Sequence, residues 1–236
     1  MRNNKMRIAI YILIFTIFSL NLSAQDLENQ FEEIIPYTKE LSWTYMDGYV
    51  GMIDKTGKVI IPNQYTKIEN FVNRVAVCHV KRKKGIIAIN GKILVEPEFD
   101  NIEPFGKLHY KIKKRGKVGL LNSSGKVIVE CDFDHISDFK NGVAYTYKKK
   151  RMGLIDITGK ILIPNEYESI GEFKNGFAPT VKKKLLGVIS ITGQELIPNQ
   201  YTFIDAFKDG AATAFTLDGV VMINIAGNVL SKQRNK

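Results

Sequence analysis

The chain has 236 residues, of which 44% are hydrophobic, 10% aromatic and 25% charged, and this composition excludes a disordered or collagen-like chain. With 34 Lys and Arg against 24 Asp and Glu the formal charge is +10, a surplus that indicates either an anionic partner or a surface kept soluble by charge. Two cysteines exclude a disulfide scaffold and a cysteine-rich zinc module.

The N-terminal segment predicts export. A basic stretch from Met1 to Arg7 precedes an uncharged apolar run from Ile8 to Leu22, which Ser23 and Ala24 follow. This order is typical of a signal peptide, so residues 1–24 are predicted to be removed. The alternative is a retained N-terminal anchor, although the run is short for a membrane span of about 20 residues. We expect a periplasmic, outer-surface or secreted protein with no transmembrane span in its mature chain.

The remaining sequence repeats every 34 residues. One glycine series marks the start of each unit and a second lies six residues later, at 57, 91, 125, 159, 193 and 227. Units therefore start near Gly51, Gly85, Gly119, Gly153, Gly187 and Val221, after an N-terminal half unit at 25–50. Such a period is typical of units that must stack on neighbours to bury their apolar faces. We predict one repeat domain over 25–231 and a polar tail at 232–236.

Each unit begins with a predicted β-hairpin. In Gly153–Ile163 two apolar runs flank Gly159, at a turn position that favours positive φ. The residue three places before the turn glycine varies among Asp, Asn, Ser and Ala, which favours hydrogen bonding within the turn over catalysis.

Two further features complete each unit. An aromatic, an isoleucine and a second aromatic recur at intervals of three, as in Tyr167, Ile170 and Phe173. We interpret this triplet as core, with a sugar-stacking platform as the alternative. An alternating segment such as Val143–Tyr147 then predicts a half-buried antiparallel strand.

The predicted fold is all-β: about six antiparallel units in tandem, arranged either as a propeller-like closed ring or as an open β-solenoid. The first triplet, near Phe31, lacks its own hairpin and the last hairpin, Val221–Leu230, lacks its own triplet. Closure would result if each end supplied the half that the other lacks.

These residues carry a family resemblance. The pattern Gly-x-Ile-Asp-x-x-Gly-Lys-x-x-Ile-Pro-x-x-Tyr-x-x-Ile-x-x-Phe-x-x-Gly-x-Ala, clearest in Gly153–Ala178, resembles the bacterial WG-repeat (KWG-repeat) family. The aromatic that usually precedes the first glycine is absent; that position holds Val50, Lys84, Val118, Met152, Leu186 and Val220. The resemblance implies a non-catalytic, often exported, repeat surface and supplies no catalytic residues.

Basic residues gather just before the first glycine of four units, which predicts a basic edge when the units stack. Acidic residues cluster instead between the aromatics of the triplets, so the molecule is expected to be electrically two-sided. The edge would bind an acidic glycan, lipid headgroups or an acidic protein, or would serve solubility alone. The candidate anion- or partner-binding residues are Lys81, Arg82, Lys83, Lys84, Lys113, Lys114, Arg115, Lys117, Lys148, Lys149, Lys150, Arg151, Lys182, Lys183 and Lys184.

No catalytic, cofactor-binding or metal-binding residues are predicted. His79, His109 and His135 occupy different places in their units, and Cys78 and Cys131 are expected to be buried thiols, with one disulfide as the alternative. We predict an exported, non-catalytic binding or scaffolding module without a cofactor and with nucleic acid an unfavoured partner. The alternatives are a glycan-active hydrolase on a propeller-like ring and a purely structural surface protein.

Overall fold

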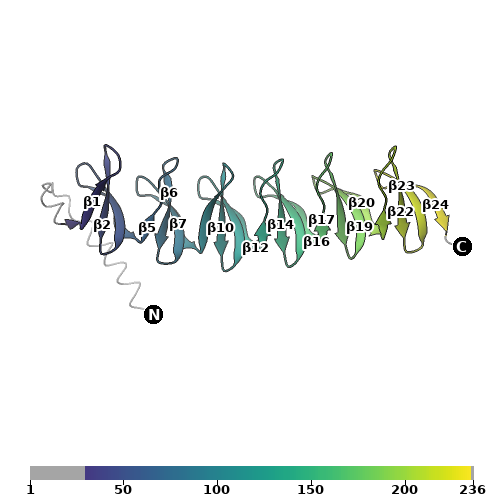
Figure 1. Ribbon diagram of the computed structural model, residues 1–236, viewed down its shortest axis with the longest axis horizontal. Helices are drawn as coiled ribbons and strands as arrows, with labels where there is room; N and C mark the ends of the chain where they lie inside the picture. Colours follow the sequence, from purple (N-terminus) through teal and green to yellow (C-terminus); the bar gives the residue numbers. More distant parts are fainter. Residues whose placement is uncertain (1–29, 235–236) are drawn as a thin grey trace. The chain divides into compact units, whose positions relative to one another are not determined.

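The computed structural model describes residues 30–234, so the expected signal peptide at 1–24 lies outside the described residues. Every element between these limits is a β-strand, and the strands form six antiparallel four-stranded sheets in tandem (Figure 1). The all-β repeat architecture is therefore confirmed. We number the sheets 1 to 6 in chain order.

The chain divides into two compact units between Glu98 and Phe99. Unit 1 contains sheets 1 and 2, and the strand that ends sheet 2 reaches the boundary. Its strands are β1 (Glu33–Pro36), β2 (Leu41–Met46), β3 (Tyr49–Asp54), β4 (Val59–Tyr65), β5 (Lys67–Ile68), β6 (Val75–Val80), β7 (Lys83–Ala88) and β8 (Ile93–Phe99).

Unit 2 contains sheets 3 to 6. Its strands are β9 (Asn101–Phe105), β10 (His109–Lys114), β11 (Lys117–Asn122), β12 (Val127–Phe133), β13 (His135–Ile136), β14 (Val143–Lys148), β15 (Arg151–Asp156), β16 (Ile161–Tyr167), β17 (Ser169–Ile170), β18 (Phe177–Lys182), β19 (Leu185–Ser190), β20 (Glu195–Tyr201), β21 (Phe203–Ile204), β22 (Ala211–Thr216), β23 (Gly219–Asn224) and β24 (Val229–Arg234).

Each sheet takes its four strands from one continuous segment, in sequence order. Sheet 1 is complete from β1 to β4 and sheet 6 from β21 to β24, so neither end of the array supplies a half that the other lacks. That premise of ring closure is corrected: among residues 30–234 no sheet is shared between the ends of the chain. The last strand also extends to Arg234, into the residues expected to form a polar tail.

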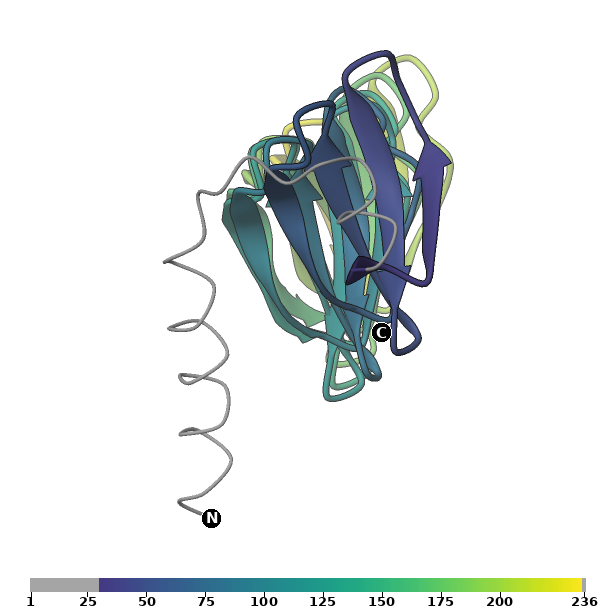
Figure 2. The ribbon, with the colours of Figure 1, turned by 90° about the vertical axis from the view of Figure 1, so that its left-hand side faces the viewer.

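The alternating strand directions give every sheet two different edges. The hairpin edge holds the turn between the second and third strands together with the linker to the next sheet. The loop edge, at the opposite end of the strands, holds the loop between the first and second strands and the turn between the third and fourth. Figure 2, in which sheet 1 faces the viewer, shows turns at both ends of its strands.

The predicted triplets form the core between stacked sheets. In sheet 4, Leu154, Ile163 and Tyr167 pack against three residues of sheet 5, namely Ile170, Ala178 and Ile189. The first aromatic of the triplets at 65, 99, 133, 167 and 201 is buried, whereas the second is half-buried in most units. The core interpretation is confirmed, because neither face of an inner sheet can be left in water.

The glycine that starts each hairpin is required by a close approach of the fourth strand. A Cβ added at Gly153 would lie 2.6 Å from the carbonyl oxygen of Ile163, closer than real Cβ contacts allow. The register between β15 and β16 shifts on both sides of Leu154, which leaves Gly153 opposite this bulge. In sheet 6 Val221 takes the glycine's place and pairs directly with Lys232 without a shift there. Where a valine side chain replaces the glycine, the third and fourth strands therefore pair regularly at this position.

The glycine in the hairpin turn, six residues after the one that starts the hairpin, contacts the preceding sheet. Gly159 has a φ of +87°, a conformation that non-glycine residues adopt only at a cost. A Cβ there would lie 2.5 Å from the carbonyl oxygen of Ile128 in sheet 3. The expected side-chain hydrogen bonds within the turn are present as well: Asp156 Oδ1 accepts from the N–H groups of Thr158 and Lys160.

A pair formed by a buried threonine and a half-buried asparagine links the second strand to the fourth in three of the sheets. Thr146, 1% exposed, hydrogen-bonds through its Oγ1 to Asn165 Oδ1, and Asn165 Nδ2 donates to the backbone oxygens of Thr146 and Arg151. Thr44 with Asn63 and Thr180 with Asn199 repeat the arrangement. In sheet 3 the equivalent positions hold Ile112 and Cys131. In the three sheets that have the buried threonine, an asparagine amide is the partner of its hydroxyl.

We predict that Gly153→Ala destabilises sheet 4 by about 2–4 kcal/mol, because the methyl group forces β16 away from β15. Val221→Ala at the equivalent position instead removes two methyl groups from a buried side chain, creates no such clash and should cost about 1–2 kcal/mol. Hydrogen exchange checks this: amides of β15 and β16 should lose protection in the first variant, while β23 and β24 keep theirs in the second. Equal loss of protection would contradict the assigned role of the glycine.

We also predict that Thr146→Ile and Asn165→Cys are each destabilising by about 1–3 kcal/mol, because the first removes a hydrogen-bond partner of the half-buried Asn165 and the second leaves the buried Thr146 hydroxyl unsatisfied. The double variant, which reproduces the pair of sheet 3, should cost less than the sum of the two. Chemical unfolding of the four proteins in a double-mutant cycle measures the difference. Strict additivity would show that the pair is not coupled.

Candidate anion-binding surface

All fifteen predicted residues lie at the hairpin edge, in or beside the turn between the second and third strands of sheets 2 to 5. Those at 81–84 belong to unit 1, and the other three groups belong to sheets 3, 4 and 5 of unit 2. The corresponding turns of sheets 1 and 6 carry Asp47-Gly48 and Asp218-Gly219 instead. Within unit 2 the periodicity thus brings three basic turns to one edge of a stack.

The structure separates these residues into two sets. The first, which we call the exposed turn cations, consists of side chains that project into solvent and have no ion-pair partner among the described residues. They are Lys81, Arg82, Lys113, Arg115, Lys149, Lys150, Lys183 and Lys184. Each of the four turns contributes two of them, so this set is the candidate site.

The second set is half-buried and engaged with other side chains. Four of its members form ion pairs: Lys117 with Asp134, Lys148 with Asp132, Arg151 with Glu168 at 2.9 Å, and Lys182 with Glu166 at 2.6 Å. Lys114 lies over the ring of Phe99 at 5.6 Å, and Lys83 and Lys84 are half-buried at the start of β7. The expected two-sided charge separation is therefore incomplete, since carboxylates reach the basic turns.

Two of these carboxylates connect successive sheets. Asp134, in the linker between sheets 3 and 4, pairs with Lys117 of sheet 3 and accepts the backbone N–H of Lys149 in sheet 4 at 2.8 Å. Glu168 repeats this between sheets 4 and 5: it pairs with Arg151 and accepts the N–H of Lys184 at 3.3 Å. We call Asp134 and Glu168 the linker carboxylates. They place each turn relative to the sheet before it.

Sequence reasoning missed these carboxylates, although a signal was present. Acidic residues occur at 98, 132 and 166 and again at 100, 134 and 168, at the repeat period and only in units with basic turns. The corresponding places before sheets 2 and 6 hold Thr66 and Thr202. The acidic positions therefore accompany the basic turns of sheets 3, 4 and 5, whereas sheet 2 has a basic turn without them.

The backbone of the basic turns is unusual for lysine. Lys149 and Lys150 have φ values of +50° and +60°, and Lys183 and Lys184 have +53° and +63°. Two successive residues with positive φ favour Asn-Gly or Asp-Gly. The chain uses such residues at the loop edge, where Asn141-Gly142 and Asn175-Gly176 have positive φ as well. Lysine thus stands where the turn geometry disfavours it.

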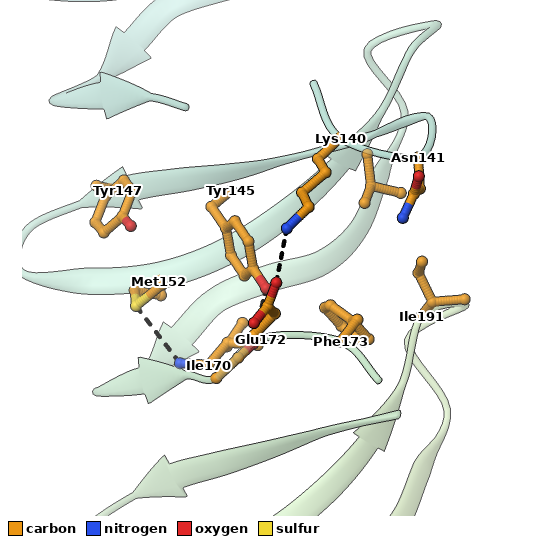
Figure 3. A pocket seen from close by; sticks show the side chains of 11 residues that line it. Lys140, Asn141, Tyr145, Tyr147, Met152, Ile170, Glu172, Phe173 and Ile191 are labelled. Atoms are coloured by element: carbon orange, nitrogen blue, oxygen red, sulfur yellow. Dashed lines mark hydrogen bonds and ion pairs between the residues drawn. The ribbon is translucent and has the colours of Figure 1, made fainter. Parts of the chain in front are cut away.

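A groove lies between sheets 4 and 5 (Figure 3). It has a volume of about 270 Å³ and is lined mainly by Tyr145, Phe173, Met152 and Ile170. Lys140 and Glu172 form an ion pair of 2.6 Å across it, and the Tyr145 hydroxyl donates to the carbonyl oxygen of Gly171 at 2.7 Å. The groove is therefore lined largely by apolar side chains, and three of its polar side chains, Lys140, Glu172 and Tyr145, already have partners.

The remaining reactive side chains are dispersed. His79 contacts Glu69 at 3.0 Å, whereas His109 and His135 each lie against an aromatic ring. No group of three potential metal ligands occurs within residues 30–234. Cys78 and Cys131 do not form a disulfide; burial raises the pKa of Cys78 to about 11, and Cys131 is only half-buried.

Fold and surface together define a tandem β-repeat protein with basic turns at the hairpin edge of sheets 2 to 5. The chain belongs to the family of the WG containing repeat, whose model matches residues 51–77, 85–117, 119–150, 152–185 and 187–217. No curated protein matches the sequence significantly.

Solved structures show remote likeness. Hsv2p of Kluyveromyces lactis is 9% identical, with 81% of this chain and 74% of that one covered and a TM-score of 0.30. PorZ of Porphyromonas gingivalis is 8% identical, with 87% and 38% covered and the same TM-score of 0.30. Family membership rests on the sequence repeat and not on these likenesses. No helix in the described part of the chain is long and apolar enough to cross a membrane.

The linker carboxylates predict a pH dependence of stability. Lys117, followed by the Lys149 N–H, lowers the pKa of Asp134, and Arg151 lowers that of Glu168. A lowered pKa in the folded protein stabilises it above the unfolded pKa of about 4, and this contribution is lost as the pH falls through the folded value. Asp134→Asn should therefore lower the thermal midpoint at pH 7, and the difference from the unaltered protein should vanish in acid.

Asp138→Asn is the matched control, because it removes the same charge from an exposed residue at the loop edge of sheet 4. It should change the midpoint little at either pH. If the two variants behave alike, Asp134 does not connect the sheets as assigned.

Proposed function

We propose that this protein is an exported, non-catalytic binding module that holds an anionic ligand through the exposed turn cations. The observation that carries the proposal is the placement of lysine at consecutive positive-φ positions, Lys149-Lys150 and Lys183-Lys184. A left-handed conformation costs a residue with a side chain about 1–2 kcal/mol. Solubility alone could be met by lysines on the strands, where no such cost arises.

The arrangement also suits recognition by charge. Each basic turn projects two cations that lack carboxylate partners, while neighbouring cations are neutralised and hold the frame. Unpaired charges on one edge attract an anion over about a Debye length, 8–10 Å at ordinary ionic strength. Binding should therefore weaken as salt rises. Export, supported by the segment at 1–24, would place this edge in contact with envelope or extracellular material.

The alternatives fit less well. A glycan hydrolase needs two carboxylates about 5–10 Å apart at a cleft. The groove between sheets 4 and 5 is lined by one carboxylate, Glu172, which is engaged with Lys140. A purely structural spacer would not need lysines in disfavoured turn conformations.

The double variant Lys149→Asn and Lys150→Gly tests the proposal with two measurements that move in opposite directions. Asn-Gly suits this turn, so thermal stability should rise by about 2–4 °C. Loss of two unpaired cations should weaken binding to a heparin matrix about fivefold to thirtyfold, at up to about 1 kcal/mol per charge. Heparin serves here as a general polyanion probe.

The control Lys160→Asn with Lys174→Asn removes two exposed cations from the loop edge, one from sheet 4 and one from sheet 5. It should leave retention on the matrix nearly unchanged. Equal weakening by both double variants would mean that net charge, and not the hairpin edge, governs binding. No retention of the unaltered protein at low salt would refute the proposal.

A further inference from the structure

We propose that the ligand of the hairpin edge is a linear acidic polysaccharide with one anionic group per disaccharide. This inference rests on the proposed function and adds the class of ligand. It follows from three properties of unit 2: the interval between the basic turns, the rigidity of that interval, and the position of the linker carboxylates between the turns.

The interval is set by the stacking of sheets. Sheets 3, 4 and 5 each contribute one pair of exposed turn cations: Lys113 with Arg115, Lys149 with Lys150, and Lys183 with Lys184. Because packed sheets lie about 10 Å apart, the pairs recur at about that distance. Along the axis of a DNA helix, one strand carries a phosphate about every 3.4 Å, which is a far closer spacing than this interval.

The interval is fixed and not merely an average. The turn of sheet 4 is connected to sheet 3 through Asp134, which holds both the Lys117 ammonium and the Lys149 N–H. The turn of sheet 5 is connected to sheet 4 through Glu168 in the same way. These contacts restrain the turns relative to one another and so favour a ligand whose charges match their spacing.

The linker carboxylates also leave no unpaired cation for a closely spaced anion, because Asp134 and Glu168 neutralise Lys117 and Arg151. The side chains of Asp134 and Glu168 remain 45% and 33% exposed. Each belongs to a linker that runs from one sheet to the next, and so lies between consecutive cation pairs. A polymer with a charge on every subunit would place anions at the linkers, where Lys117 and Arg151 are already paired and no exposed cation is available. A polymer that alternates charged and neutral sugars would place its neutral ring there.

The experiment uses the full mature chain and two series of defined oligosaccharides, measured by calorimetry at low salt. Hyaluronan oligosaccharides carry one carboxylate per disaccharide, and oligogalacturonides carry one per sugar. Hyaluronan affinity should rise at least tenfold from the disaccharide to the hexasaccharide, which reaches three basic turns, and little beyond it. At equal numbers of carboxylates, the galacturonide should bind at least fivefold more weakly.

Two variants sharpen the result. Lys149→Asn with Lys150→Gly removes both cations of the middle turn, in sheet 4, and should abolish the gain in affinity from disaccharide to hexasaccharide. Asp134→Asn with Glu168→Gln removes the intervening negative charges and should bring galacturonide affinity up toward that of hyaluronan. Circular dichroism at the assay temperature confirms that each variant is folded. If this variant is unfolded, the comparison of the two sugar series on the unaltered protein still decides.

The outcomes separate this inference from the proposed function. Equal affinity for both series at equal charge, or binding to vesicles with anionic lipid but to neither series, would overturn the polysaccharide assignment and leave an anion-binding edge. Absence of binding to either series, to the vesicles and to heparin would overturn both.

Discussion

A four-stranded sheet of about 34 residues cannot bury either of its apolar faces alone, and this constraint shapes the whole molecule. The sheets of unit 2 satisfy it by close stacking, and two glycines per unit make the approach possible. Gly153 admits the bulged fourth strand of its own sheet, while Gly159 allows the turn to contact the sheet before it. The core between sheets 4 and 5 then forms from one set of repeat positions in sheet 4 and a different set in sheet 5.

Because stacking is repetitive, whatever stands at one position of the unit recurs along an edge. Lysine at a turn becomes a row of cations, and an acidic linker residue becomes a row of connections between sheets. The interplay of the two rows sorts the basic residues. Arg151 and Lys117 support the frame, whereas Lys149 and Lys183 face solvent. Local charge pairing thus decides which members of a uniform basic run are available to a ligand.

Much of this could be predicted from the sequence, because a strict period reports which residues share an environment. The hairpins, the turn glycines and the core triplets followed from it, and so did the edge that carries the basic residues. Asp134 could not be placed, because its partners Lys117 and Lys149 belong to different sheets and meet only on stacking. The completeness of sheet 1 was missed since the glycine marks the start of a hairpin and not of a sheet.

The pair of Thr146 and Asn165 bears on how such an array can change over generations. Its two members come from different strands of one sheet, and sheet 3 replaces both together with Ile112 and Cys131. An exchange that transfers whole sheets between units keeps either pair intact. An exchange that breaks within a sheet would place the half-buried asparagine amide against an isoleucine and leave it without its threonine partner. The seams at which this array can be recombined without loss are therefore its linkers, the same segments that carry the carboxylates.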